Sequence, residues 1–224
     1  MVAKGWKMSN FFKQNNLVEI HGDRFIVDII YAKPENITMH PVYEEVGFGA
    51  KAYIHADVAK CLKAVEKKLK DLKLKMRITD AYRPPVAHRR ILELLPLEDL
   101  FASKPENSLH CYGTAIDCCL TDEKGKNLKF PTEIDAYDKK YAWQIAFGQT
   151  DDFYKCFAKA RSDFYDEHYS REIYNRELLK SIMLNSGFEC IGREWWHFQL
   201  PYVKERYPFI EWVEPKSKKT KKGA

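Results

Sequence analysis

The residues of this chain that are best suited to chemistry lie in one short stretch, residues 108–117, which begins with a serine and ends with an aspartate. Within it, His110 offers an imidazole nitrogen and Asp117 a carboxylate oxygen, and both groups bind zinc in proteins. The pattern predicts a polar loop that leads into an apolar strand over residues 114–120. A histidine and an aspartate at this separation are most often unrelated, so the pair indicates a metal site only together with a third ligand.

The candidate for the third ligand is His197, which follows Glu194 by three residues. A catalytic zinc ion keeps three protein ligands and one position open for water. His110, Asp117 and His197 would form such a set, with one zinc ion per chain. The metal would lower the pKa of the bound water toward about 7 and polarise a substrate carbonyl. Glu194 is then the candidate general base, which takes a proton from the water and passes it to a leaving amine.

Arg83, in the segment Asp80-Ala-Tyr-Arg, is the candidate that would stabilise charge in such a reaction. When water adds to a carbonyl group, negative charge develops on the oxygen, and a guanidinium group beside it stabilises that charge. The alternative interpretation of Arg83 is a structural ion pair.

The spacing between Glu194 and His197 sets a geometric condition. Side chains alternate between the two faces of a strand, so an offset of three residues would point these two to opposite faces. Both can reach one metal ion only if Glu194 lies at the entry to the strand or if a bulge intervenes. We therefore predict an irregularity at Glu194. The alternative is that Glu194 is only a partner of one of the metal ligands and does not act as the general base.

Several other residues invite a chemical interpretation and receive a structural one. Cys118 and Cys119 directly follow Asp117, and we interpret them as small buried residues of the strand. Trp195 and Trp196 are expected to pack in the core. Five further histidines have no partner motif and no predicted role: His21, His40, His55, His88 and His168.

The elements that must position these residues follow from hydrophobic spacing. A stripe at spacings of three and four predicts the clearest helix, at residues 57–72, and the stripe consists of Val58, Cys61, Leu62, Val65, Leu69 and Leu72. Two more helices are predicted at residues 84–95 and 171–185. Strands are predicted at residues 74–79, 114–120 and 188–200, after an extended segment over residues 17–30 with a turn at residues 21–23. The mixture predicts an α+β fold, with helices packed around a small, mostly antiparallel sheet that carries the zinc cleft.

The charge of the chain is concentrated at its C-terminal end. The formal net charge is +5, and five lysines lie in residues 216–224, so the rest of the chain is close to neutral. This balance argues against a globular nucleic-acid-binding surface and leaves only the tail for anionic partners. With 224 residues the chain suggests one domain at residues 17–214, with an insertion at about residues 136–170. Residues 1–16 are expected to form a flexible leader and residues 215–224 a disordered tail.

The compartment is predicted from what the chain lacks. No run of apolar residues is long enough for a secretory signal or a membrane span. The six cysteines form no C-x-x-C pair and are expected to be free thiols. We expect a cytoplasmic protein.

Three motifs together resemble those of the D-alanyl-D-alanine dipeptidases, zinc enzymes of the vancomycin-resistance type. This family of dipeptidases is related to D,D-carboxypeptidases, lysostaphin-like peptidases and the hedgehog domain. The motifs are Asp80-Ala-Tyr-Arg-Pro84, Ser108-x-His110-x-x-Gly113-x-Ala-Ile-Asp117 and Glu194-Trp-Trp-His197. The resemblance extends over about residues 17–200, and includes Tyr31-Ala and Ile182-Met-x-Asn-Ser-Gly-Phe188.

The resemblance implies the same zinc ligands, the same base and the same arginine as the residues themselves suggest. It also implies that Tyr31, Ser108 and Asp135 hold the dipeptide, with Asp135 beside its ammonium group. The loop before Asp135 departs from the family, which has Met-Gly where this chain has Phe130-Pro131 and Phe where it has Ile134. Asp138 is close enough in the sequence to be confused with Asp135 in this comparison.

The leading hypothesis is thus a zinc dipeptidase for D-Ala-D-Ala or a similar D-amino-acid dipeptide, in which metal-bound water attacks the peptide carbonyl. The alternative within enzymes is a D,D-carboxypeptidase or peptidoglycan endopeptidase that cuts longer peptides. From a different class comes a zinc-binding interaction domain without catalysis. Oligomeric state and the role in cell-wall metabolism stay open at this point.

Overall fold

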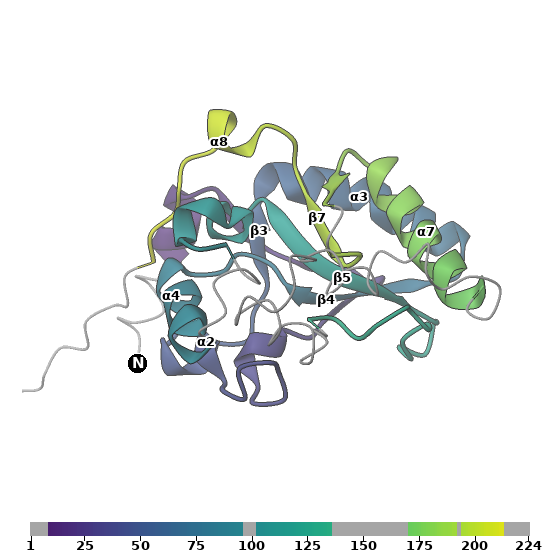
Figure 1. Ribbon diagram of the computed structural model, residues 1–224. Coiled ribbons are helices and arrows are strands. Elements are labelled where there is room, and N and C mark those ends of the chain that lie inside the picture. Colours follow the sequence, from purple (N-terminus) through teal and green to yellow (C-terminus); the bar gives the residue numbers. More distant parts are fainter. Residues whose placement is uncertain (1–8, 96–101, 136–169, 192–193, 213–224) are drawn as a thin grey trace, which may run out of the picture.

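A five-stranded sheet forms the centre of the computed structural model, which describes residues 9–95, 102–135, 170–191 and 194–212 (Figure 1). The order of its strands is β2-β4-β5-β7-β6. They span Phe25–Val27, Lys75–Asp80, Ala115–Thr121, His197–Gln199 and Glu189–Cys190 respectively. β2 runs parallel to β4, and every other pair is antiparallel. With the helices below, this arrangement confirms the predicted α+β fold and its mostly antiparallel sheet.

Two long helices pack against this sheet, and two shorter helices lie beyond the end of β4. The longest two, α3 (Ala56–Asp71) and α7 (Ser170–Leu184), contact each other and the central strands (Figure 1). α2 (Val42–Glu45) and α4 (Pro85–Leu94) contact each other at the end where β4 stops. A separate antiparallel pair joins β1 (Leu17–Glu19) to β3 (Tyr53–His55). The remaining short elements are η1 (Ile30–Ala32), η2 (Pro105–Asn107), η3 (Leu109–Tyr112) and α8 (Val203–Arg206).

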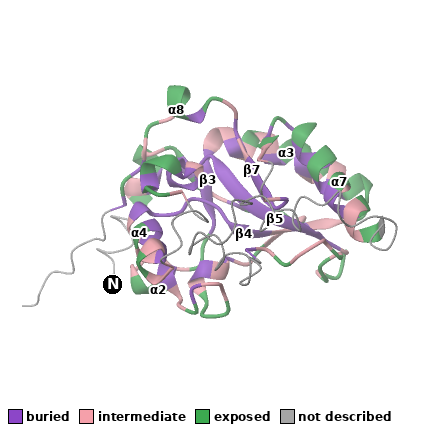
Figure 2. Cartoon of the chain, viewed as in Figure 1, coloured by how far each residue is buried: buried purple, intermediate pink, exposed green. Residues whose placement is uncertain are grey.

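Helix α3 confirms the clearest helix expected from the sequence. Val58, Leu62, Val65 and Leu69 of the apolar stripe are buried, and the lysines of the other face are mostly exposed (Figure 2). Leu72 departs from the prediction, because it follows the last helical residue and is 46% exposed. At the N-terminal end, Nδ1 of His55 accepts the backbone N–H of Asp57 at 3.2 Å, which satisfies one of the free donors of the first turn.

Strand β5 is buried along all seven residues, so it is a central strand covered on both faces (Figure 2). Its side chains alternate between faces. Cys118 and Leu120 pair with Ile78 and Met76 of β4 within the core, and Asp117 stands on the other face. Cys118 and Cys119 are both buried, as predicted, and the five described cysteines are free thiols.

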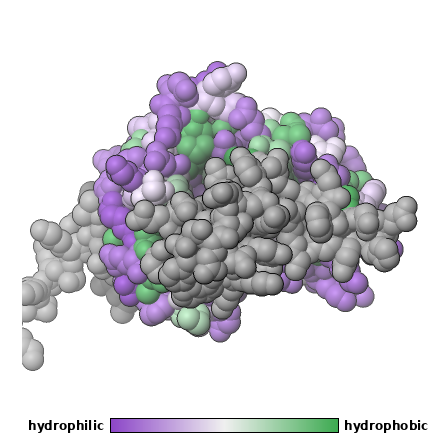
Figure 3. Space-filling view, in the orientation of Figure 1, coloured by the Kyte–Doolittle hydropathy of each residue, from purple (hydrophilic) through white to green (hydrophobic). Residues whose placement is uncertain are grey.

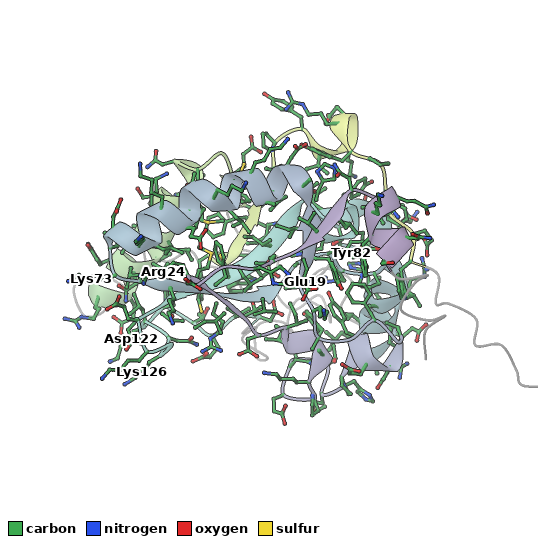
Figure 4. The ribbon with its side chains drawn as sticks, turned by 180° about the vertical axis from the view of Figure 1, so that it is seen from behind. Glu19, Arg24, Lys73, Tyr82, Asp122 and Lys126 are labelled. Atoms are coloured by element: carbon green, nitrogen blue, oxygen red, sulfur yellow. The ribbon has the colours of Figure 1, made fainter. Side chains whose placement is uncertain are left out.

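The two ends of the β4–β5 pair differ in character. At one end, the carboxylate of Asp122 accepts the backbone N–H groups of Lys124 and Lys126, both at 2.9 Å, and Gly125 adopts a φ of 85° to close a polar turn. Asp122 and Lys126 lie far from Tyr82, which marks the other end of β4 (Figure 4). The chemical residues gather near the Tyr82 end.

Two local predictions need correction. Residues 188–200 do not form one strand but two, β6 and β7, separated by a turn at Trp195 and Trp196, and the two pair with each other. The stretch before β5 is a buried 3₁₀ helix, η3, rather than an open polar loop. It ends at Gly113, whose φ of 69° is unfavourable for other residues, and a Cβ atom at this position would lie only 2.6 Å from Cδ2 of Leu17.

The segment expected to be a leader is partly packed against the core. Residues 9–14 are helical, and the Phe12 ring stacks on Tyr53 with centroids 3.7 Å apart. Residues 1–8, the predicted insertion and the lysine tail lie outside the described residues. In the described part of the chain, no helix is long and apolar enough to cross a membrane. On the face shown in Figure 3, hydrophilic residues cover most of the described surface and hydrophobic ones form small separate patches.

Candidate metal and catalytic site

The three predicted ligands come from three elements that meet at one point. Asp117 in β5 and His197, the first residue of β7, are directly paired across the antiparallel ladder. His110 arrives from η3, which precedes β5. Nδ1 of His197 lies 3.1 Å from Oδ1 of Asp117 and 3.1 Å from Nε2 of His110, which in turn lies 3.4 Å from Oδ2 of Asp117. All three side chains are buried, and their ligand atoms lie within 4.8 Å of one another, so the group could hold a metal ion.

The outer hydrogen bonds of the two histidines test whether the group fits a cation. Nδ1 of His110 donates to the carbonyl of Ala81 at 2.8 Å, and Nε2 of His197 donates to Oε1 of Gln199 at 3.1 Å. Because both partners are acceptors, the inner nitrogen of each neutral ring carries a lone pair. Two lone pairs and the Asp117 carboxylate therefore converge at about 3 Å, where they repel one another unless a cation lies between them. The donor set fits a metal ion.

The electrostatics of the group favour positive charge in the same place. Burial disfavours the charged form of His110, but the carboxylates of Asp117 and Asp80 outweigh it and raise the pKa of the imidazole. Burial likewise opposes ionisation of Asp117, yet His110 and His197 hold the pKa of its carboxyl well below the usual range. The pocket thus stabilises an ionised carboxylate next to a cation.

Glu194 lies beside the three ligands and not on the far face of the sheet. It precedes the turn at residues 195–196, where the backbone N–H of His197 bonds to the carbonyl of Glu194 at 3.3 Å. This turn is the predicted irregularity, and it brings Oε2 of Glu194 to 3.7 Å from Nδ1 of His197. Burial raises the pKa of the Glu194 carboxyl to about 7, with Asp117 and Asp135 adding to the rise and His197 opposing it. A carboxyl group with such a pKa can both accept and return a proton near neutral pH.

Arg83 is buried at the end of β4 and carries the ion pair considered as its alternative role. Its Nε and Nη2 atoms donate to Oδ2 of Asp80 at 2.9 and 2.7 Å. The guanidinium carbon lies 5.1 Å from the ring centre of Tyr31. Its charge also reaches the site, because it is among the groups that lower the pKa of Glu194 against the effect of burial. The ion pair and a role toward substrate are therefore compatible.

The residues expected to hold a substrate are placed around this group. Asp135 is buried and accepts the hydroxyl of Tyr31 at 2.7 Å. Burial, followed by the charge of Asp117, raises the pKa of Asp135 to about 7, so this carboxylate lies within electrostatic reach of the ligands. Ser108 is buried immediately before η3, two residues ahead of His110. Asp138 lies outside the described residues.

Trp195 holds the loop that carries Asp135. Its ring stacks on Phe130 with centroids 4.2 Å apart and an interplanar angle of 5°. Its Nε1–H donates to Oγ1 of Thr132 at 2.9 Å. Trp195 and Trp196 are both buried, as predicted. Trp195 and Asp135 also line a cavity of about 770 Å³ that extends along the same loop.

Sequence reasoning missed three residues that surround Arg83. Asp80 stood inside a quoted motif without a role, although its spacing of three from Arg83 is a signal for an ion pair. Tyr43, whose hydroxyl donates to Oδ1 of Asp80 at 2.5 Å, left no signal in the sequence. His88 was assigned no role, yet its Nδ1 lies 3.4 Å from Nη1 of Arg83.

Comparison with known proteins agrees with the three motifs. A family model described as D-ala-D-ala dipeptidase matches residues 151–213, a range that includes Glu194 and His197. D-alanyl-D-alanine dipeptidase of Escherichia coli (strain K12) is 29% identical over 185 residues, which cover 82% of each chain. The D-alanyl-D-alanine dipeptidase of Enterococcus faecium is 28% identical over 204 residues, which cover 85% of this chain and 93% of that protein. The resemblance indicated by the motifs is therefore confirmed: the chain is similar to D-alanyl-D-alanine dipeptidases over most of its length, and this similarity supports a metallopeptidase.

Proposed function

We propose that this protein is a zinc-dependent dipeptidase that hydrolyses D-Ala-D-Ala or a similar D-amino-acid dipeptide. The observation that carries the proposal is the convergence of two histidine lone pairs and the Asp117 carboxylate, with the Glu194 carboxylate 3.7 Å from one of the ligand atoms. The names of both relatives point to the same substrate.

In this proposal His110, Asp117 and His197 hold one zinc ion, which supplies Lewis acidity toward water and the peptide carbonyl when bound. Glu194 takes a proton from the attacking water, for which its raised pKa suits it, and then gives that proton to the departing amine. Arg83 stabilises the negative charge that develops on the carbonyl oxygen. The turn at residues 195–196 is what lets the base and a ligand face the same substrate atom.

The acidic lining of the pocket supports a substrate with a free ammonium group. Asp135 is buried, and its ionised form is disfavoured by burial and by Asp117, so an added cation would relieve that cost. Tyr31 donates to one oxygen of Asp135 and fixes its orientation. A dipeptide would therefore lie between Asp135, at its amine end, and Glu194, at the scissile bond. Ser108 is the further candidate for a contact with the dipeptide.

The decisive experiment combines metal analysis with turnover. Purified protein is expected to contain about one zinc per chain and to hydrolyse D-Ala-D-Ala. Glu194→Ala should retain zinc and lose turnover by about two to four orders of magnitude, the usual effect of removing a general base. Glu189→Ala, which changes an exposed carboxylate on β6, is the matched control and should keep full activity.

Two outcomes would contradict the proposal. Bound zinc without turnover in the wild type would indicate a metal-binding domain without catalysis, and equal activity in Glu194→Ala would remove the proposed base.

Longer peptides are the second candidate, since the motifs also resemble those of enzymes related to the D,D-carboxypeptidases. Parallel assays on D-Ala-D-Ala and on a peptidoglycan stem pentapeptide separate the two. Turnover of the pentapeptide alone would favour a D,D-carboxypeptidase or endopeptidase. A free dipeptide as substrate would fit the cytoplasmic location expected from the sequence, which fractionation of cells would test.

A further inference from the structure

The guanidinium group of Arg83 is held from two sides by buried residues. On one side Nε and Nη2 both donate to a single oxygen, Oδ2 of Asp80. The other oxygen of Asp80 accepts the hydroxyl of Tyr43 and the backbone N–H of Ala81, at 2.5 and 2.9 Å. Asp80 is therefore saturated with donors and fixed in place. Since both of its bonds to Arg83 converge on one atom, they anchor the guanidinium group at a pivot and leave its tilt to other contacts.

His88 supplies a contact on the opposite side. Nη1 of Arg83 donates to Nδ1 of His88 at 3.4 Å. Nε2 of His88 donates to the carbonyl of Ala102 at 2.7 Å, and a carbonyl can only accept, so the ring proton resides on Nε2. The lone pair on Nδ1 therefore faces the guanidinium group. Burial, aided by the charge of Arg83, lowers the pKa of His88 to about 3, so the ring stays neutral and keeps this acceptor near neutral pH.

We propose that His88 is a positioning residue for Arg83: its Nδ1 atom fixes the tilt of the guanidinium group that Asp80 anchors at the other edge. This inference rests on the proposed function, in which Arg83 stabilises charge on the substrate carbonyl. The oxyanion contact depends on direction as well as distance, and a guanidinium group whose tilt is less restrained would lose part of it.

The other ring nitrogen of His88, Nε2, connects this residue to the segment that leads to His110. Ala102 leads through η2 to Ser108 and His110. The backbone N–H of Arg83 also bonds to the carbonyl of His110 at 3.1 Å. His88 on α4 thereby ties the arginine to the segment that provides one of the three proposed metal ligands.

Two substitutions separate the functions of the two ring nitrogens. In His88→Gln the amide nitrogen can occupy the place of Nε2 and keep the bond to Ala102, but the acceptor at Nδ1 is lost. In His88→Asn the amide oxygen can occupy the place of Nδ1 and accept from Arg83, while the reach to Ala102 is lost. Both substitutions replace the imidazole ring with an amide side chain at the same buried position, so each variant is the control of the other.

For hydrolysis of D-Ala-D-Ala we expect His88→Gln to lower kcat by about tenfold, the effect typical of a hydrogen bond to a charged group, and to leave KM within about twofold. His88→Asn should retain kcat within about threefold and lower the unfolding temperature instead. In an Arg83→Lys background, His88→Gln should have no further effect on kcat, because the two residues act through one contact. An unchanged kcat in His88→Gln would overturn the proposal. So would a loss of kcat on His88→Gln that is as large in the Arg83→Lys background as in the wild type.

A measurement without turnover separates this proposal from the proposed function. The pKa of His88, followed by nuclear magnetic resonance of the labelled ring, should rise in Arg83→Met, because the neighbouring cation is removed. If that rise occurs and the wild-type protein does not hydrolyse the dipeptide, the proposed function is wrong and the contact between His88 and Arg83 is supported. If the protein hydrolyses the dipeptide and the pKa of His88 does not respond, the contact fails.

Discussion

At the scale of single residues, the site depends on which nitrogen of each histidine carries the proton. His110 and His197 use opposite ring nitrogens toward Asp117, Nε2 in the first and Nδ1 in the second. In each ring the outward nitrogen is tied to an oxygen acceptor, Ala81 for His110 and Gln199 for His197. Such outer contacts fix the tautomer of a metal-binding histidine and orient the ring.

Gln199 therefore offers a prediction at this scale. Gln199→Leu should weaken zinc binding by about 10- to 100-fold, since the acceptor that holds the proton on Nε2 of His197 is lost. Gln199→Glu retains an acceptor and should restore the affinity. Zinc dissociation constants measured by competition with a chelating dye would show the difference, and equal affinity in Gln199→Leu and the wild type would count against this role.

At the scale of elements, short helices and turns place the chemical residues, and their caps and contacts can be tested one at a time. Helix α3 begins at a cap made by a histidine side chain, His55, which accepts from the backbone N–H of Asp57. Lys60 and Tyr207 also surround this cap, since both contact the Asp57 carboxylate.

The His55 cap predicts a pH dependence of stability. Burial, followed by the charge of Lys60, lowers the pKa of His55 in the folded state, with Asp57 opposing the shift. The unfolded chain, with a histidine pKa of about 6.5, then binds more protons below that pH. The contribution of the cap is complete above pH 6.5 and decreases as the pH falls.

This dependence can be isolated by comparison with variants. The free energy of unfolding of the wild type should fall more between pH 7.5 and pH 5.5 than that of His55→Ser, which keeps a cap acceptor that does not titrate. At pH 7.5, His55→Ala should lose about 1 kcal/mol, the usual value of an N-cap. The free energy of unfolding is measured by urea unfolding at each pH. If it changes with pH to the same extent in the wild type and in His55→Ser, titration of His55 is not the cause of the pH dependence.

The loop that carries Asp135 gives a second prediction at the scale of elements. Trp195→Phe keeps the stacked ring on Phe130 but removes the N–H that bonds to Thr132. We expect KM for D-Ala-D-Ala to rise by about two- to tenfold with little change in kcat, because one neutral hydrogen bond that orders the binding loop is lost.

Thr132→Val removes the same bond from its other end and serves as the matched variant. It should raise KM to a similar extent, and the double variant should show no further rise. Additive effects of the two substitutions would show that they act on different contacts.

At the scale of the whole molecule, the proposed zinc ion joins three parts of the chain. β5 and β7 are neighbours in the sheet, and η3 is linked to the end of β4 through the bonds of His110 to Ala81 and Arg83. Since the ligands converge only in the folded chain, metal binding should stabilise the folded state.

Removal of zinc should therefore lower the unfolding temperature. At a free zinc concentration of about 100 times the dissociation constant, the stabilisation is about 2.7 kcal/mol, which for a chain of this size corresponds to about 5–10 °C. Calorimetry with a chelator and after re-addition of zinc would measure it. Glu194→Ala should show the same shift as the wild type and His110→Ala should show none; a shift retained in His110→Ala would place the metal elsewhere.

Much of this structure was predictable because it depends on residue patterns within short stretches of the chain. The stripe of α3, the strand that becomes β5 and the residue types of the three motifs are all visible within short windows, and the structure brings His110, Asp117, His197, Glu194 and Asp135 together. Even the turn after Glu194 followed from the period of a strand, since a base and a ligand three residues apart cannot share a face of a regular strand.

Other features depend on contacts between residues that are distant in the chain, and only the tertiary structure decided them. Tyr43 meets Asp80 across 37 residues, and Phe12 docks on Tyr53 although its segment was expected to be a leader. His88 looked like an unassigned histidine until the fold set its two nitrogens between Arg83 and Ala102. Sequence by itself determined which groups could do the chemistry, because ligand and base are properties of residue type and spacing. The packing of separate segments decided the proton positions and the orientation of Arg83, because a hydrogen bond requires a partner within about 3 Å, whatever its place in the chain.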